Sequence, residues 1–154
     1  MFYILGFVVF LIITIFADII FGGLATVYFT IPAMLLLLLS LVAVMTATRS
    51  FKVFGRGLKA VILPKKPLSE ETRGQAATLF RLLSKTTALA AAIGVLINVI
   101  IMLIGSDWSD LDARLKLGGN IAISLIFPLY ALFMIAAIFE PVVFNLKKRR
   151  DTVR

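Results

Sequence analysis

The chain of 154 residues is 61% hydrophobic and carries a net charge of +8. Its mean hydropathy of +1.07 is far above that of a soluble domain of this size. It contains neither Cys nor His, which excludes disulfides, thiol chemistry, most zinc sites and catalytic Ser/His or Cys/His pairs. We therefore expect an all-α membrane protein that is not an enzyme and that uses no metal or other cofactor.

Four apolar blocks are each near or above the roughly 20 residues that a helix needs to cross a bilayer. They lie at about 2–22, 29–48, 86–104 and 120–142. The first block lacks a basic region before it and is long for a signal peptide, so we expect it to be a true span. The remaining segments are too short for a second domain, and the whole chain 1–154 is predicted to be one membrane domain.

The positive charges indicate the topology. Of the 16 Lys and Arg residues, nine lie in segment 49–85 and five lie between Lys147 and Arg154. The positive-inside rule places segment 49–85 and the tail 143–154 in the cytoplasm, and an even number of spans then places the N-terminus there too. Lipid headgroups are the expected counter-ions of these basic segments, and nucleic acid is not an expected partner.

The cytoplasmic segment begins with an amphipathic pattern, SFKVFGRGLKAVI. One helical face would carry its large apolar side chains, which are Phe51, Phe54, Leu58 and Val61. The opposite face would carry Lys52, Arg56 and Lys59. This pattern predicts a helix that lies in the membrane interface, with Gly55 and Gly57 as weak points.

Two capping residues predict where spans two and three begin. Thr30 precedes Pro32, and Ser69 precedes Glu70 and Glu71. Because only Gly74 interrupts the helical pattern after Ser69 before the span itself, span three is predicted to continue the cytoplasmic helix without a break. Span four is likewise predicted to extend into the basic tail. The expected fold thus has four spans, with the third and fourth extended into the cytoplasm.

Small and polar residues form a stripe on each of the last two spans. On span three they are Thr87, Ala91, Gly94 and Asn98, and on span four they are Asn120, Ser124, Pro128 and Ala131. At 1.5 Å of rise per residue, Asn98, Ser124 and Pro128 are predicted to lie at one depth. Such stripes allow close helix approach with polar contacts across it. Tight packing and a wet path for ions both remain open.

Two prolines in span four and two carboxylates near span ends are unusual in membrane helices, and their roles must be explained. Pro128 leaves the carbonyl of Ser124 without its usual donor, and Pro141 does the same near the cytoplasmic end of span four. Glu140 lies beside Pro141, and Asp18 lies near the outer end of span one. Simple interfacial residues, ion entry or exit, and contacts between subunits are alternative roles for these two carboxylates.

Segments 89–105 and 117–149 resemble the MotA/TolQ/ExbB proton-channel family. Gly94, Met102 and Leu103 fit the glycine-containing third span of the family. The match to the fourth span comprises Gly118, Ala122, Leu125, Tyr130, Phe139, Pro141, Leu146, Lys147 and Arg149. The chain is similar to a short MotA-like protein without the large cytoplasmic domain of the flagellar stator.

The resemblance implies a homopentameric ring in the bacterial cytoplasmic membrane. The ring would surround a single-span partner of the MotB, ExbD or TolR type that carries a membrane aspartate. Ion flow past that partner would drive rotation. The third and fourth spans would line the path through Thr87, Ala91, Gly94, Asn98, Ser124, Phe127, Pro128 and Ala131. Glu140 and Pro141 would mark its inner end.

The departures from the family pattern keep two alternatives open. Val95, Phe127 and Pro128 stand where the family has threonines that are thought to help ions pass. Segment 49–85 is also much shorter than the rotor-binding domain of stators. One alternative is a pentameric membrane scaffold of the same fold that conducts no ions. The other is an unrelated four-span transporter, which we expect to be a dimer.

Overall fold

The computed structural model describes residues 8, 9, 12, 30–62, 68–105, 119 and 121–151, with the backbone alone at 149–151. Most of the predicted span 2–22, with Asp18, lies outside the described residues, as do Gly118 and Asn120. The described part of the chain forms helices and no strands. This confirms the all-α prediction.

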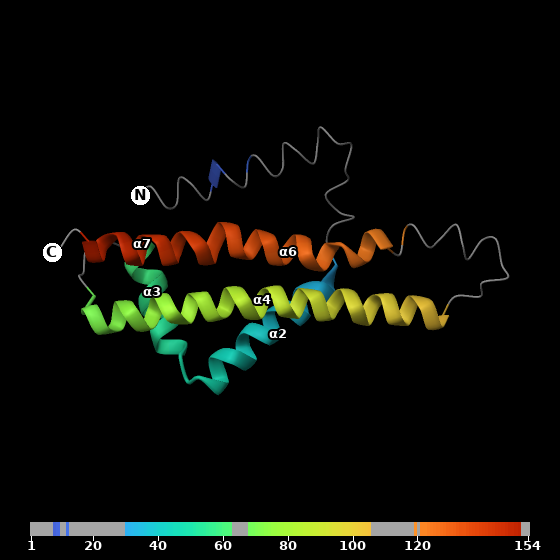
Figure 1. Ribbon diagram of the computed structural model, residues 1–154, viewed down its shortest axis with the longest axis horizontal. Helices are drawn as coiled ribbons and strands as arrows, with labels where there is room; N and C mark the ends of the chain where they lie inside the picture. Colours follow the sequence, from blue (N-terminus) through green and yellow to red (C-terminus); the bar gives the residue numbers. More distant parts are fainter. Residues whose placement is uncertain are drawn as a thin grey trace.

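Two long helical rods lie side by side and run in opposite directions (Figure 1). The first rod is the helix α4, Glu70–Gly105. The second joins α6 (Ile126–Met134), the π-helix η2 (Ile135–Phe139) and α7 (Glu140–Asp151). Helix α2 (Ile31–Ala47) crosses α4 obliquely, and α3 (Phe51–Ile62) lies across the end where α4 begins.

Two of the described helices, Glu70–Gly105 and Ile121–Lys148, are long and apolar enough to cross a membrane. If α2 and α3 are counted as one span, the number of candidate membrane helices is three, although the chain bends by 113° between α2 and α3. With 36 residues, α4 is ~54 Å long and exceeds the ~30 Å hydrocarbon core of a bilayer. The prediction that the helix beginning after Ser69 continues into span three without a break is therefore confirmed.

The two predicted caps differ in outcome. The Ser69 hydroxyl accepts the backbone N–H of Thr72 at 3.3 Å, which confirms the cap of α4. Thr30 makes no side-chain cap, and its buried Oγ1 has no hydrogen-bond partner among the described residues. Its backbone N–H instead donates to the Tyr130 hydroxyl at 3.3 Å. The start of α2 is thus fixed to α6, with Pro32 in its first turn.

Helix α2 ends in a tight reversal. The Arg49 N–H donates to the Thr46 carbonyl, and the Ser50 N–H donates to the Met45 carbonyl. This pair of bonds is the Schellman pattern, which normally places Gly in the left-handed position. Here Arg49 occupies it with φ 50°, at a cost of roughly 1–2 kcal/mol for an L side chain.

The apolar face of α3 packs largely on the rest of the chain, a contact that the prediction of a helix in the membrane interface did not include. Phe54 stacks on Phe80 of α4 with ring centroids 5.2 Å apart. Gly57 is buried against the same ring. Of the predicted face, only Phe51 remains substantially exposed, at 49%. Gly57 is therefore a position of close helix contact.

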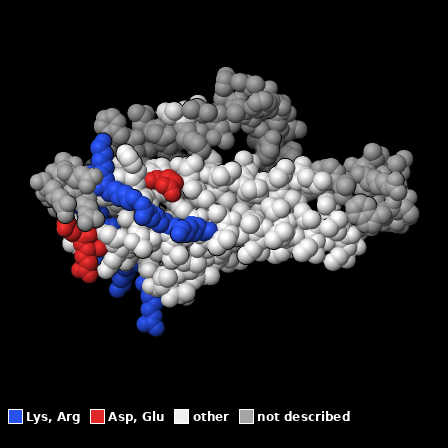
Figure 2. Space-filling model, viewed as in Figure 1, with Lys and Arg blue, Asp and Glu red and all other residues white. Residues whose placement is uncertain are grey.

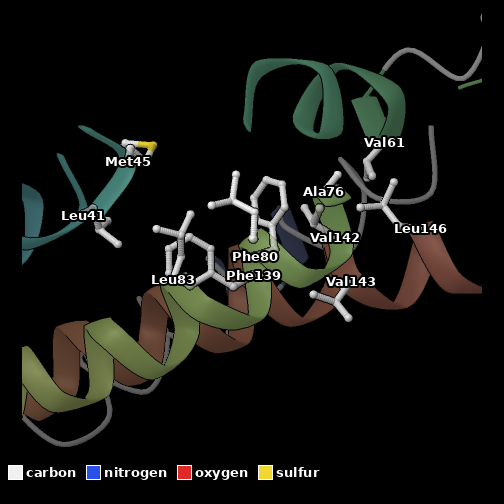
Figure 3. Close-up of a cluster of buried hydrophobic side chains, with 11 residues drawn as sticks. Leu41, Met45, Val61, Ala76, Phe80, Leu83, Phe139, Val142, Val143 and Leu146 are labelled. Atoms are coloured by element: carbon white, nitrogen blue, oxygen red, sulfur yellow. The ribbon is translucent and has the colours of Figure 1, made fainter. Parts of the chain in front are cut away.

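The core at this end joins five elements (Figure 3). Its buried members from α2, α3, α4, η2 and α7 are Leu41, Met45, Val61, Ala76, Leu79, Phe80, Leu83, Phe139, Val142, Val143 and Leu146. The charges of the visible face gather around the same end, and the rest of the described surface is uncharged there (Figure 2). Among the described residues, the charged side chains on this face therefore lie toward one end of the two rods.

Two glycines of α3 provide a matched test of its contact with α4. A Cβ at Gly57 would lie 2.8 Å from Phe80 and 3.1 Å from Ala76, whereas a Cβ at Gly55 would have nothing within 4 Å. Both Gly→Ala changes gain about 1 kcal/mol of helix propensity, but overpacking at Gly57 costs about 1–3 kcal/mol. We expect Gly57→Ala to unfold more easily than Gly55→Ala by that overpacking cost. Thermal unfolding in detergent measures this, and equal melting of the two variants would contradict the packing.

Candidate functional site

A hydrogen bond joins α4 to the start of the second rod within the apolar part of the molecule. The Asn98 Nδ2 donates to the Ser124 Oγ at 2.7 Å. Ser124 is only 2% exposed, while Asn98 is half-buried. The prediction that these two side chains lie at one depth is confirmed. A polar contact in such surroundings holds the two helices in a fixed register.

The helix around Ser124 is interrupted at one residue. Residues 121–124 are helical, Leu125 is in a turn, and α6 begins at Ile126. The Leu125 N–H is shared between the carbonyls of Ile121 at 3.2 Å and Ala122 at 3.1 Å. Because Pro128 has no N–H, it cannot bond the Ser124 carbonyl. The structure thus has a one-residue turn at Leu125, beside the polar contact, within a helix that continues from Ile121 to Lys148; the bend predicted from Pro128 stays a prediction.

The stripe on α4 is a packing seam inside the chain. Thr87 is fully buried, and its hydroxyl donates to the Leu83 carbonyl of its own helix at 2.8 Å. Ala91 and, on α6, Ala131 are each 3% exposed and belong to one cluster. Small side chains at these positions allow α4, α2 and α6 to approach closely. For Thr87, Ala91 and Ala131 the structure therefore agrees with the alternative of tight helix packing. Ion passage along the seam stays a prediction.

Gly94 is a point of close helix approach in the seam. A Cβ there would clash with the Phe127 ring and would lie 2.9 Å from Cδ2 of Leu36. The ring of Phe127, which stands at a position where the resembled family has a threonine, thus lies over the glycine. Sequence reasoning identified both residues but did not predict that one fills the space left by the other.

The inner end of the second rod contains a feature that the sequence analysis missed. The π-helix η2 ends at Glu140, whose N–H donates to the Ile135 carbonyl. Glu140 is exposed, and Pro141 is half-buried. The Pro141 carbonyl accepts the Asn145 Nδ2 at 2.7 Å. Pro141 was the available signal, since a missing donor often accompanies a local change of helix type. The structure places Glu140 and Pro141 apart from the Asn98–Ser124 contact.

Ser84 extends the seam by one further turn. It lies three residues before Thr87, is 8% exposed, and its Oγ has no partner among the described residues. The spacing of four and three residues on α4 would have revealed it if it had been followed toward the start of the helix. Within the described part of the chain, no group of three His, Cys, Asp or Glu residues is placed to hold a metal.

Comparison of the chain with protein-family models, with curated proteins and with solved structures finds no match.

The Gly94 contact predicts an overpacked variant with a specific rescue. Gly94→Ala should destabilise the fold by about 1–3 kcal/mol, because the new methyl group meets the Phe127 ring. Adding Phe127→Leu should recover part of this loss, since the shorter side chain vacates the space. Gly74→Ala on the same helix is the control, because its Cβ would have nothing within 4 Å. Unfolding in SDS followed by circular dichroism gives the order of stability, and a Gly94→Ala protein as stable as the control would refute the contact.

The bond between Asn98 and Ser124 predicts energetic coupling. Replacing each by Ala, separately and together, should give an interaction free energy of about 0.5–1.5 kcal/mol. The same unfolding assay measures all four proteins. Strictly additive effects would show that the two side chains do not bond in the membrane.

Proposed function

We propose that the chain is the membrane subunit of a proton or other ion channel that powers a rotary motor around a single-span partner. In this proposal the protein has four spans with both termini in the cytoplasm of a bacterium. Five copies form a ring in the cytoplasmic membrane, and the partner, which carries an aspartate in its span, passes through the centre. The proposal rests on the resemblance of the last two spans to the MotA/TolQ/ExbB family together with the following features.

The observation that carries the proposal is the Asn98–Ser124 hydrogen bond. It lies in apolar helix between residues that are otherwise small or hydrophobic, next to the break before Pro128. Polar groups inside a membrane are costly and tend to mark ion or substrate pathways. Irregular backbone at that depth is tolerated where it meets protein or a water-filled space. A neutral amide and a hydroxyl at a broken helix suit contact with a hydrated ion.

The proton acceptor in this proposal belongs to the partner. Segments 86–104 and 120–139 contain no Asp, Glu, Lys, Arg or His, and the one carboxylate of the predicted span 120–142, Glu140, lies near its inner end, so the parts of these spans around Asn98 and Ser124 supply no acidic or basic side chain. They supply hydrogen-bonding groups and a shaped surface. A carboxylate on a central helix would complete the path, and this division of roles is the one that the resemblance implies.

The outer face of α4 also supports assembly in a membrane. Its exposed apolar side chains include Leu89, Ile93, Leu96, Ile97, Ile100 and Ile101. Such a face requires contact with lipid or with a neighbouring subunit, because in water it would be a large exposed apolar patch. In the proposed ring, part of this face would contact the next copy or the partner.

A second candidate is a pentameric scaffold of the same fold that conducts no ions. The contact of Phe127 with Gly94 favours it, because an aromatic ring fills the level at which the family has hydroxyl groups. The scaffold would bind the same kind of partner but would work without an ion gradient.

Native mass spectrometry of the protein from its own host, in mild detergent, tests the assembly. Five copies of 16.9 kDa with the added mass of a small partner would support the proposal. Five copies without a partner would favour the scaffold. A monomer or a dimer would refute the ring and favour a small transporter.

The channel itself is tested by Asn98→Leu in the complex reconstituted with its partner. We expect the pentamer to assemble and the ion flux, measured with a pH- or sodium-sensitive dye inside vesicles, to be lost. Asn145→Leu is the matched control, because it removes an amide that bonds only the Pro141 carbonyl at the cytoplasmic end. Unchanged flux in Asn98→Leu would exclude Asn98 from the path, and equal loss in both variants would point to general damage.

A further inference from the structure

The elbow between α2 and α3 turns the chain from crossing the apolar layer to lying along its edge. The change of direction is 113°, so α3 does not advance further in the direction of α2. At the end of α2, Thr46 and Thr48 donate their hydroxyls to the Val42 and Val44 carbonyls, at 2.7 and 2.8 Å. Both hydroxyls are thus satisfied within α2 itself. Helix α3 therefore starts at the level where the apolar part of α2 ends.

Four basic side chains lie along this elbow and the outer face of α3. This basic stripe consists of Arg49, Lys52, Arg56 and Lys59, all of them exposed. The last three follow spacings of four and three residues, which place them on one side of the helix. The opposite side, with Gly57 and Val61, is buried against the rest of the chain. The stripe thus faces away from the protein.

Nothing on the same segment neutralises the stripe. The sequence from 30 to 62 contains no Asp or Glu. Phe51, at the start of α3, is 49% exposed beside the basic residues. A half-exposed aromatic ring between cations is typical of a helix that contacts both headgroups and acyl chains.

Arg49 adds an independent indication. Its φ of 50° is the only positive value among the described residues other than glycine. Gly or Asn would adopt this backbone at less cost, and such outliers are associated with functional positions. A guanidinium at this point lies at the boundary where lipid phosphates are found, and it binds phosphate oxygens in a bidentate manner.

We propose that the basic stripe binds the phosphate headgroups of anionic phospholipids in the leaflet where α2 ends, with the Phe51 ring inserted among the acyl chains. The opposite charge of the ligand and the position of the elbow at the end of an apolar helix identify a lipid surface as the occupant. The inference is independent of the proposed channel function, since it requires only that α2 lies in the membrane.

Because the chain contains no Cys, a fluorophore attached to one introduced cysteine labels a single known position. Gly55→Cys lies beside the stripe, and its Cβ would have nothing within 4 Å. We would attach an environment-sensitive fluorophore there and reconstitute the full chain in vesicles of phosphatidylcholine mixed with phosphatidylglycerol. Quenching by brominated phosphatidylglycerol is then compared with quenching by brominated phosphatidylcholine.

We expect phosphatidylglycerol to be preferred by about fivefold for each basic side chain that contacts it. In the variant with Lys52, Arg56 and Lys59 all replaced by Gln, the preference should fall to about fivefold, which is the share of the remaining Arg49. The matched control replaces Arg81, Lys147 and Lys148 by Gln, which removes the same charge from exposed positions of α4 and α7. The control should keep the preference of the parent protein.

Three results would overturn the proposal. The first is equal quenching of the labelled parent protein by both brominated lipids. The second is an equal loss of the preference in both triple variants, which would assign the preference to the whole basic end of the chain. The third is loss of the preference when soluble glycerol phosphate is added at millimolar concentration, which would indicate a site for free phosphate. Misfolding of the triple variants is controlled by a measurement on the labelled parent protein, whose charges are unaltered. Added salt should weaken its preference for phosphatidylglycerol.

Discussion

The close approach of α4 to α6 at Gly94 is the constraint on which the rest of the structure depends. Lipid gives two apolar helices no hydrophobic reason to associate, so van der Waals packing and polar contacts must hold them together. Because Gly94 has no side chain, the Phe127 ring can pack directly on α4. The small side chains of Ala91 and Ala131 continue this contact toward the start of α4. Gly57 repeats this arrangement where α3 meets Phe80. One device, a small residue beneath an aromatic ring, thus joins both parts of the chain.

Close helices then determine where polar groups can lie. Thr87 satisfies its hydroxyl within α4, whereas Asn98 and Ser124 satisfy each other between helices. The backbone of the second rod departs from the α-helix at two places, the turn at Leu125 and the π-helix before Pro141. Each departure lies close to a proline that removes a backbone donor. The departures therefore divide the rod into segments, with the exposed Leu125 and Glu140 at the two boundaries.

Much of this arrangement could be predicted from the sequence because it depends on local patterns. Apolar length predicted the helices, Ser69 predicted the start of α4, and helix rise predicted the level of Asn98 and Ser124. The apolar face of α3 was predicted correctly, but its contact with Phe80 was not predicted, because amphipathicity does not distinguish lipid from protein. Thr30 was predicted as a cap, but its side chain makes no cap bond, and Tyr130, which lies 100 residues away, accepts its N–H. Such long-range contacts leave no periodic signal. The ring, the partner and the ion path stay predictions.

The seam constrains how the proposed channel would work. Within one chain it is filled at Gly94, Ala91 and Thr87, so an ion would have no space to follow it from end to end. Asn98 is different, because it is half-buried while its partner Ser124 is 2% exposed. Its amide therefore connects the seam with the outer surface of the chain. In a ring, this places the ion path between subunits or against the central partner, with Asn98 at its wall and the interior of each subunit as a rigid support.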